Sequence, residues 1–188
     1  MTIELRPLTL DDVVLAHRLT AAAERADGVP YVTTLEEIHE RFVEPGFDVL
    51  LDGRVALLDG EPAGVGLVRH APSGERLEVA ALDGCVDPSM RRRGVGTSLL
   101  AWQIERGREV MSAYGHGLPC HLRTYHFVDH TDAIALVERA GLEPVRWFDQ
   151  LARPLAEPLD VPAPEGVTIV GWDPARQEEV RQARNAAF

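Results

Sequence analysis

The chain contains no lysine, and this absence excludes two broad groups of enzymes. All 19 basic residues among its 188 residues are arginine. A Walker A nucleotide-binding loop requires its lysine, and a pyridoxal phosphate enzyme requires a lysine to form its Schiff base. Neither kind of site can be built from these residues.

Long apolar runs and a cysteine framework are also missing. No apolar stretch approaches the roughly 20 residues that span a bilayer. The N-terminal segment MTIELRPLTLDD lacks the basic region and apolar core of a secretory signal. The two cysteines, Cys85 and Cys120, suit a reducing compartment and provide no disulfide framework. We therefore expect a cytoplasmic protein with no membrane partner.

The net charge is strongly negative, with one local exception. A formal charge of −11 argues against a nucleic-acid partner, which calls for a broad basic face. Arg91, Arg92 and Arg93 nevertheless stand side by side, and a local cationic cluster on an acidic protein suits a small anionic ligand. Taken alone, three adjacent arginines are more often a solvated surface run. The residues around them decide between the two interpretations.

Hydrophobic periodicity and turn residues predict an α+β fold in residues 1–153. The predicted elements are a strand at 2–8, helices at 11–26 and 33–43, three strands between 54 and 86, a helix at 95–113, a strand at 121–128, a helix at 131–140 and an extended strand at 142–155. Tight turns are expected at Asp59-Gly60 and Ser73-Gly74. This order predicts a mixed, mostly antiparallel central sheet flanked by helices, with one βαβ crossover.

The C-terminal segment is expected to hold a linker and the beginning of a repeated domain. Residues 154–166 are rich in proline and predict a stiff linker. Residues 167–188 predict a strand followed by a helix, and a shift of 166 residues places them on the strand and helix that begin the chain. The alternative is an ordinary C-terminal tail. We expect this piece to dock on the first domain or to exchange between two copies, which would give a homodimer through residues 166–188.

The arginine cluster lies where a predicted strand gives way to a predicted helix. The stretch from Cys85 to Leu100 reads CVDPSMRRRGVGTSLL. Gly94 and Gly96 carry no Cβ, so backbone N–H groups can close around phosphate oxygens. The N-terminus of the helix directs unpaired N–H groups and its positive dipole end at the same place. Together these features predict a phosphate-binding turn.

This stretch resembles motif A of the GNAT superfamily of N-acetyltransferases, V-x-P-x-x-R-x-x-G-x-G followed by Thr or Ser and paired leucines. The matching residues are Val86, Pro88, Arg91, Gly94, Gly96, Thr97, Leu99 and Leu100. The resemblance covers residues 2–153 in element order and implies the GNAT fold with acetyl-CoA as co-substrate. It implies that the strand splays from its neighbour, that the backbone of Val86 binds pantetheine and that the loop binds the pyrophosphate. The loop residues so implied are Arg91, Arg92, Arg93, Gly94, Val95, Gly96 and Thr97.

A second stretch, from His130 to Leu142, resembles the family's later motif N-x-x-A-x-x-L-Y-x-x-x-G-F. The alanine, leucine and glycine match, while His130 takes the place of the asparagine at the cofactor site. Val137 replaces the tyrosine that usually protonates the coenzyme A thiolate, and valine has no proton to donate. The sequence therefore predicts cofactor binding by a domain that lacks the usual general acid.

Candidates for the remaining chemical roles are few. Glu78 and Asp83 lie on the strand before the loop, where a general base would stand, and Asp83 is nearer the thioester; either can instead be a solvated strand residue. Tyr125 on the next strand could supply the acid, although a packed tyrosine is more common. Cys85 is interpreted as a small buried thiol rather than a nucleophile.

No metal site is predicted. The candidate ligands are His116, His121, His126 and His130, together with Cys120. Their spacing matches no helical or zinc-finger ligand pattern.

Two functional hypotheses follow for residues 1–153. In the first, the domain transfers the acetyl group of acetyl-CoA to a primary amine of a small molecule. In the second, it holds acetyl-CoA without catalysis and supports a catalytic C-terminal GNAT domain; the layout is similar to that of tandem GNAT proteins of the mycothiol synthase-like kind. A non-enzymatic α+β scaffold would require the motif match to be accidental.

Overall fold

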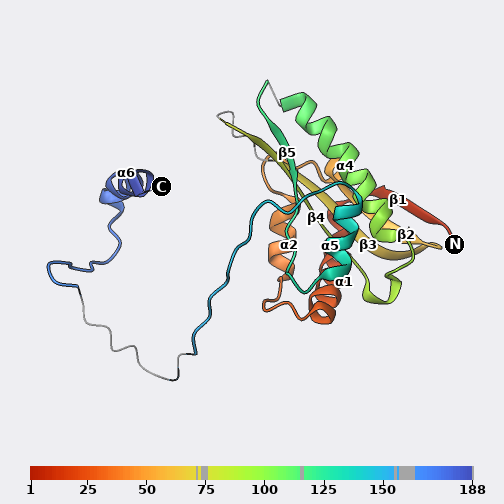
Figure 1. The fold of residues 1–188 in the computed structure, drawn as a ribbon, viewed down its shortest axis with the longest axis horizontal. Helices are drawn as coiled ribbons and strands as arrows, with labels where there is room; N and C mark the ends of the chain where they lie inside the picture. The colour runs from red at the N-terminus through yellow and green to blue at the C-terminus, as the bar shows by residue number, and fades with distance from the viewer. Residues whose placement is uncertain (71, 73–75, 115–116, 155, 157–163, 188) are drawn as a thin grey trace. The chain divides into compact units, whose positions relative to one another are not determined.

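The computed structural model describes residues 1–70, 72, 76–114, 117–154, 156 and 164–187 (Figure 1). Two compact units can be distinguished, Met1–Val145 and Arg146–Phe188. The first unit contains the sheet and the predicted cofactor loop. The predicted turn at Ser73-Gly74, His116 and most of the predicted linker lie outside the described residues.

The first unit is built on a five-stranded sheet with the order β1-β2-β3-β4-β5. The strands are β1 (Ile3–Pro7), β2 (Gly53–Leu58), β3 (Glu61–His70), β4 (Glu78–Val86) and β5 (Cys120–Arg123). Neighbouring strands are antiparallel except β4 and β5, which are parallel and joined through a helix. The predicted mixed sheet with one βαβ crossover is thus confirmed.

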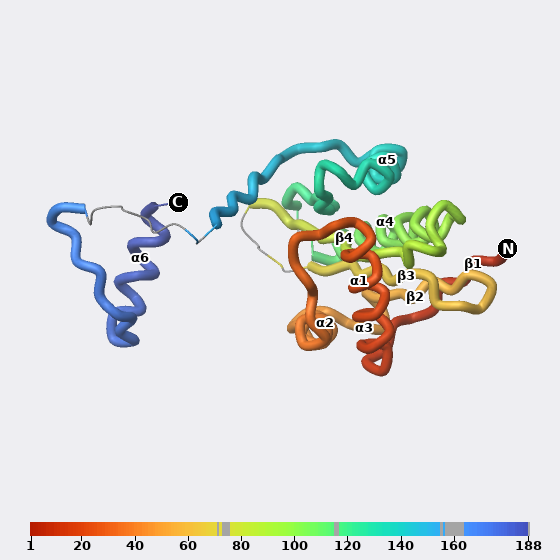
Figure 2. Tube along the Cα trace, turned by 90° about the horizontal axis from the view of Figure 1, so that it is seen from below, coloured from red at the N-terminus to blue at the C-terminus, as the bar shows by residue number. Residues whose placement is uncertain are grey.

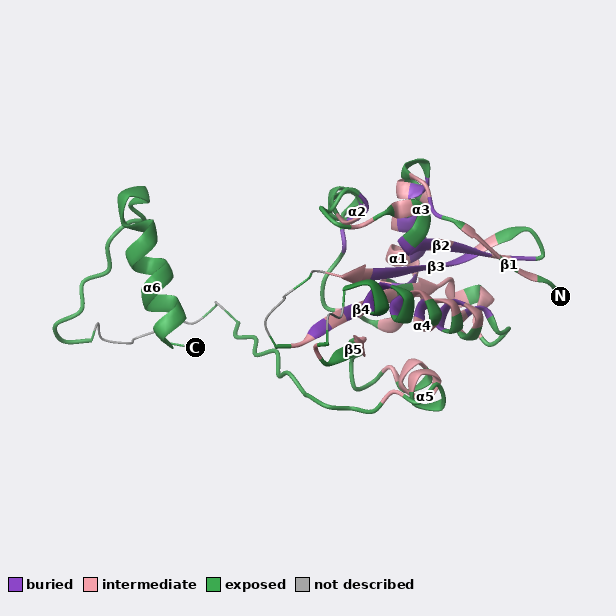
Figure 3. Cartoon of the chain, turned by 90° about the horizontal axis from the view of Figure 1, so that it is seen from above, coloured by how far each residue is buried: buried purple, intermediate pink, exposed green. Residues whose placement is uncertain are grey.

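Helices cover both faces of this sheet (Figure 2). On one face lie α1 (Val13–Asp27), α2 (Leu35–Phe42) and α3 (Val49–Asp52); on the other lie α4 (Val95–Tyr114) and α5 (Thr131–Arg139). Alternate residues of β3 serve the two layers: Val65 and Leu67 pack toward α1 and α2, whereas Val68 packs toward α4. Purple ribbon in Figure 3 marks this buried core, which fixes β4 between two packed layers.

Capping and turn residues in the sequence predicted where several elements begin. Thr34 caps α2 in a capping box, in which its side chain accepts from the Glu37 N–H and the Glu37 carboxylate accepts from the Thr34 N–H. The hairpin turn at Asp59-Gly60 has both residues at positive φ, 51° and 90°. The short helix α3 was not predicted; Asp48 caps it by accepting from two backbone N–H groups.

Three strand predictions were wrong. β5 ends at Arg123 instead of continuing to 128, and neither 142–154 nor the described residues of 164–173 form a strand. A strand requires a paired neighbour, and the described part of the second unit offers none. The predicted helix from Glu178 is present as α6 (Gln177–Ala187), and all its side chains are exposed.

Candidate functional site

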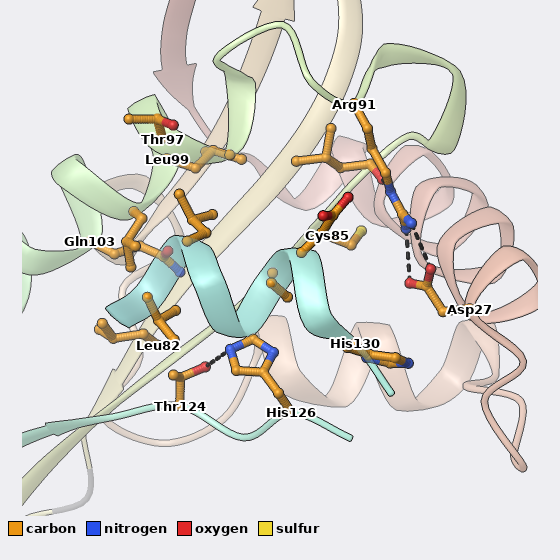
Figure 4. Close-up of a pocket in the computed structure, with 18 of the residues that line it drawn as sticks. Asp27, Leu82, Cys85, Arg91, Thr97, Leu99, Gln103, Thr124, His126 and His130 are labelled. Atoms are coloured by element: carbon orange, nitrogen blue, oxygen red, sulfur yellow. Dashed lines mark hydrogen bonds and ion pairs between the residues drawn. The ribbon is translucent and has the colours of Figure 1, made fainter. Parts of the chain in front are cut away.

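A cavity of about 790 Å³ opens where β4 and β5 diverge (Figure 4). Its walls are the C-terminal half of β4, the N-terminal turns of α4, the segment from Thr124 to Arg139 and the end of α1. β4 residues from both faces of the sheet line it: Cys85 packs with the α1 layer, and Leu82 packs with Leu100 of α4. The cavity therefore passes through the sheet at the point where the strands part.

The opening arises because β4 loses one neighbour before the other. β4 pairs with β3 as far as Val86, opposite Gly64, but pairs with β5 only from Glu78 to Ala81. The Asp87 N–H donates to the Ala63 carbonyl on β3 (2.8 Å). Alternation along the strand then turns the N–H and C=O of Val86 away from β3, toward the cavity. This is the splayed strand that the sequence resemblance implied.

The loop after β4 carries two residues in the left-handed region of backbone conformation. Arg92 has φ 63° and Gly94 has φ 88°, and α4 begins at Val95. Ser98 closes the first turn of the helix by donating its N–H to the Gly94 carbonyl (3.0 Å). The preceding N–H groups are therefore those that every helix leaves unpaired at its N-terminus, and here they border the cavity. Such an arrangement of successive N–H groups suits an anion.

Gly96 lies at a close approach between α4 and α5. A Cβ added at this position would lie 3.2 Å from a Leu136 methyl carbon and 3.6 Å from a Val86 methyl carbon. Both neighbours line the same cavity. Any larger side chain at Gly96 would enter the space between the open end of β4 and α5.

The three adjacent arginines have different surroundings. Arg91 is half-buried and forms a bidentate ion pair with Asp27, at 2.5 and 2.8 Å. Arg92 contacts Asp132 (3.1 Å), and both side chains are exposed. Arg93 is exposed and is not among the described residues that line the cavity. The side chain of Val95 belongs to the core, so only its backbone is available to a ligand.

The two carboxylates of β4 lie in different places. Asp83 borders the cavity, and its Oδ2 accepts from Nε of Arg69 (2.8 Å) and lies 2.7 Å from Nη2 of the same residue. Glu78 is 1% exposed and contacts Nε2 of His70 (2.8 Å) on the α4 face. The two residues are about 17 Å apart along the strand. The sequence proposed both as bases, but the structure brings only Asp83 to the cavity.

On the opposite wall, the segment after β5 contributes histidines. Thr124 and His126 line the cavity and contact each other (3.2 Å), whereas Tyr125 between them is 59% exposed and is not part of the described lining. Desolvation, with a smaller effect from His130, lowers the pKa of His126 below its ordinary value. Sequence reasoning considered His126 only as a metal ligand, because nothing local shows that it faces β4.

The α5 motif lies where the resemblance placed it. His130 precedes α5 and lines the cavity, with its ring 5.2 Å from that of Phe127. Val137 also lines the cavity and gives this wall an apolar surface. Among the described lining residues, no tyrosine is present to act as an acid.

Gln103 is a cavity residue that the sequence did not single out. Its side-chain amide donates to the Leu67 carbonyl (3.0 Å) and to the Asp83 carbonyl (2.6 Å), so it links β3 and β4 beside the opening. Gln103 is buried on α4, four residues after the core residue Leu99. A polar residue at a core position of a helix was the available signal.

The structure supports neither a nucleophilic role for Cys85 nor, among the described residues, a metal site at the histidines. Desolvation raises the pKa of Cys85 to about 11, and its sulfur lies 3.9 Å from the Thr20 hydroxyl. The thiol is therefore protonated at neutral pH, as expected for a packed cysteine. Within the described residues, no three His, Cys, Asp or Glu side chains gather closely enough to hold a metal ion. None of the described helices combines the length and apolar character needed to cross a bilayer.

Comparisons with known proteins agree with this geometry. Residues 17–142 match the family described as "Acetyltransferase (GNAT) family". The mycothiol acetyltransferase of Tsukamurella paurometabola is 32% identical over 184 residues, which cover 97% of this chain and 53% of that protein. The chain thus spans about half the length of the curated relatives it matches.

Solved structures show the same architecture. The GCN5-related N-acetyltransferase from Sphaerobacter thermophilus superimposes with a TM-score of 0.73 at 27% identity, over 99% of this chain and 58% of that one. An aminoglycoside N-acetyltransferase in complex with CoA gives a TM-score of 0.55 at 14% identity, over 81% of this chain and 95% of that one. The second likeness concerns the fold alone.

Proposed function

Since the chain belongs to the acetyltransferase (GNAT) family, we propose that residues 1–153 bind acetyl-CoA as a co-substrate at the open end of β4. The observation that carries this proposal is the cavity between the splayed strands, with a helix N-terminus at its edge. The backbone of Val86 would hold pantetheine. The N–H groups of residues 91–97 would hold the pyrophosphate, and His130 would border the cofactor from the α5 side.

Titration calorimetry with acetyl-CoA tests the proposal. The unaltered chain should show a single site, and Gly96→Leu should abolish binding because the new side chain fills the space beside Val86 and Leu136. Gly171→Leu is the matched control, since a Cβ at Gly171 meets no atom within 4 Å. Unchanged affinity in Gly96→Leu would sink the assignment.

For the reaction, we propose transfer of the acetyl group to a primary amine of a small molecule by direct attack on the thioester. Such transfer requires a base for the amine and a proton for the departing thiolate. The titratable side chains at the cavity that could serve include Asp83 and His126, but Asp83 is held by Arg69. His126 has its pKa lowered by desolvation, so it is available as a neutral base at pH 7.

Val137 favours a second candidate, a domain that binds acetyl-CoA and leaves catalysis to another domain of a tandem protein. The name of the relatives supports a role in mycothiol acetylation for such a whole protein. A thiol-release assay with a panel of amines separates the two candidates. Little turnover by this chain, with intact acetyl-CoA binding, supports the second; turnover that is lost in His126→Ala supports the first.

A second-domain start in residues 167–188 stays a proposal, as does a homodimer formed through residues 166–188. The described residues of this segment expose several large apolar side chains, among them Ile169 and Trp172. Light scattering tests the dimer: deletion of residues 166–188 should convert a dimer to a monomer that still binds acetyl-CoA. A monomer before deletion would exclude it.

A further inference from the structure

The guanidinium of Arg91 forms hydrogen bonds with two residues of its own chain, Asp27 and Val86. Nη1 and Nη2 donate to the two carboxylate oxygens of Asp27 at 2.5 and 2.8 Å (Figure 4). Nε donates to the Val86 carbonyl at 3.3 Å. A bidentate pair of this kind fixes both distance and orientation. Both partners are at least half-buried, with side-chain exposures of 35% for Arg91 and 25% for Asp27.

Asp27 occupies a position that disfavours a carboxylate. It is the last residue of α1, followed by Gly28 at φ 66°, and the C-terminal end of a helix carries the negative end of the helix dipole. Arg91 compensates for this, since its hydrogen bonds lower the pKa of Asp27 below the ordinary value despite partial burial. The pair therefore joins the end of α1 to the loop that follows β4, 64 residues away.

The end of α1 also supports the opposite wall of the cavity. Thr33, in the segment after α1, is buried and donates its N–H and hydroxyl to Glu24 of α1. Within this segment, the Tyr31 ring lies 6.2 Å from the Phe127 ring, which in turn packs against His130. A shift of α1 at Asp27 would thus disturb the cofactor strand on one side and the β5–α5 segment on the other.

We propose that Arg91 is a positioning residue that ties α1 to the cofactor strand, and that it is not a ligand of the pyrophosphate. This proposal rests on the proposed function and refines its list of ligands. The charge felt by the phosphates then comes from Arg92, which lines the cavity and whose pair with Asp132 is exposed and therefore weak, and from Arg93, whose side chain is exposed beside it. Arg91 acts through Asp27 and Val86 by holding the width of the opening.

The variant Asp27→Asn distinguishes a positioning role of Arg91 from a role as a ligand of the pyrophosphate. This variant removes a negative charge near a ligand that is itself strongly negative, so electrostatics alone predicts equal or tighter acetyl-CoA binding. Loss of the bidentate pair predicts weaker binding, by about three- to tenfold. Arg91→Gln should show a similar loss, and the double variant should be no worse than either single variant, because both remove one interaction.

Salt dependence gives the second measurement. A cationic side chain that binds the phosphates makes the affinity for acetyl-CoA fall as the salt concentration rises, because salt screens the attraction. We expect Arg91→Gln and Asp27→Asn to keep the slope of the unaltered chain, whereas Arg93→Gln should flatten it. Arg91→Lys should bind as weakly as Arg91→Gln, since lysine keeps the charge but cannot form the bidentate pair. Arg108→Gln and Asp59→Asn are the matched controls, because both side chains are exposed and away from the cavity.

Several outcomes would overturn the proposal: equal or tighter binding by Asp27→Asn, normal binding by Arg91→Lys, or a flattened slope in Arg91→Gln. Circular dichroism and thermal melting check that each variant is folded. If Asp27→Asn does not fold, the acetyl-CoA affinity of Arg91→Lys still tests the proposal. Failure of the unaltered chain to bind acetyl-CoA would instead refute the proposed function. The two failures are therefore distinguishable.

Discussion

The two ends of β4 are built in opposite ways. At the N-terminal end, Glu78 pairs with Cys120 of β5, and by Ala80 the strand is paired on both sides, with His70 of β3 and Leu122 of β5. At Val86 it is paired with β3 alone. The closed end buries a carboxylate against a histidine and lies outside the cavity, while the open end presents backbone groups to it. The cavity therefore lies where the strand has lost one partner, and Glu78, on the same strand, lies outside it.

Glu78→Ala should give the largest effect on stability and a small one on the cofactor. The variant leaves the buried His70 nitrogen without its partner, which should lower the free energy of unfolding by about 3 kcal/mol. Acetyl-CoA affinity of the folded protein should stay within about twofold, because the closed end does not touch the cavity. Chemical denaturation and calorimetry measure the two quantities. A large loss of affinity with normal stability would restore Glu78 as a site residue.

Gly84→Ala tests the open end in the same way. Gly84 has φ 157°, which side chains rarely adopt, and a Cβ there would lie 2.4 Å from the Val65 carbonyl oxygen, so β3 and β4 must move apart where β5 no longer supports them. We expect a loss of about 2 kcal/mol in the free energy of unfolding, accompanied by weaker acetyl-CoA binding. Gly171→Ala is the control, because a Cβ at Gly171 meets no atom within 4 Å. If Gly84→Ala loses stability but binds normally, the opening does not depend on this strand contact.

The pH dependence of Cys85 alkylation tests how apolar the open end is, and its expected effect is the smallest of the three. With a pKa of about 11, Cys85 is protonated below that pH, so its alkylation by iodoacetamide should be slow at pH 7–8 and should accelerate as pH rises toward 10. Cys120→Ser leaves Cys85 as the single thiol, and Cys85→Ser leaves the exposed Cys120 for comparison. Rapid alkylation of Cys85 at pH 7 would mean that the open end is more polar than the structure indicates.

The sequence predicted the features of the open end that are formed by residues adjacent in the chain. The strand, the loop with its two glycines and the helix from Val95 follow one another directly, and their spacing alone indicated an anion site. Contacts between distant residues could not be predicted this way. Arg91 and Asp27 are 64 positions apart, Gln103 reaches a carbonyl 36 positions away, and His70 meets Glu78 only because β3 folds back on β4.

Strand boundaries failed for a related reason. The apolar residues of 124–128 and 142–154 fit a strand by composition, but strand structure depends on a neighbour that composition does not reveal. In the described residues, the chain after Arg123 leaves β4 instead of continuing beside it, and this departure creates the cavity. The residue most affected is His126, which a continuous strand would have paired with β4.

Amide chemical shifts during an acetyl-CoA titration test the difference between the ends of β4 most directly. The largest changes should fall on Val86 and on residues 91–97, with smaller changes at His126 and His130 across the cavity. The amides of residues 78–81, at the closed end, should stay within the noise. Shifts concentrated at residues 78–81, or a titration without changes at residues 91–97, would contradict the assignment of the cofactor to the open end.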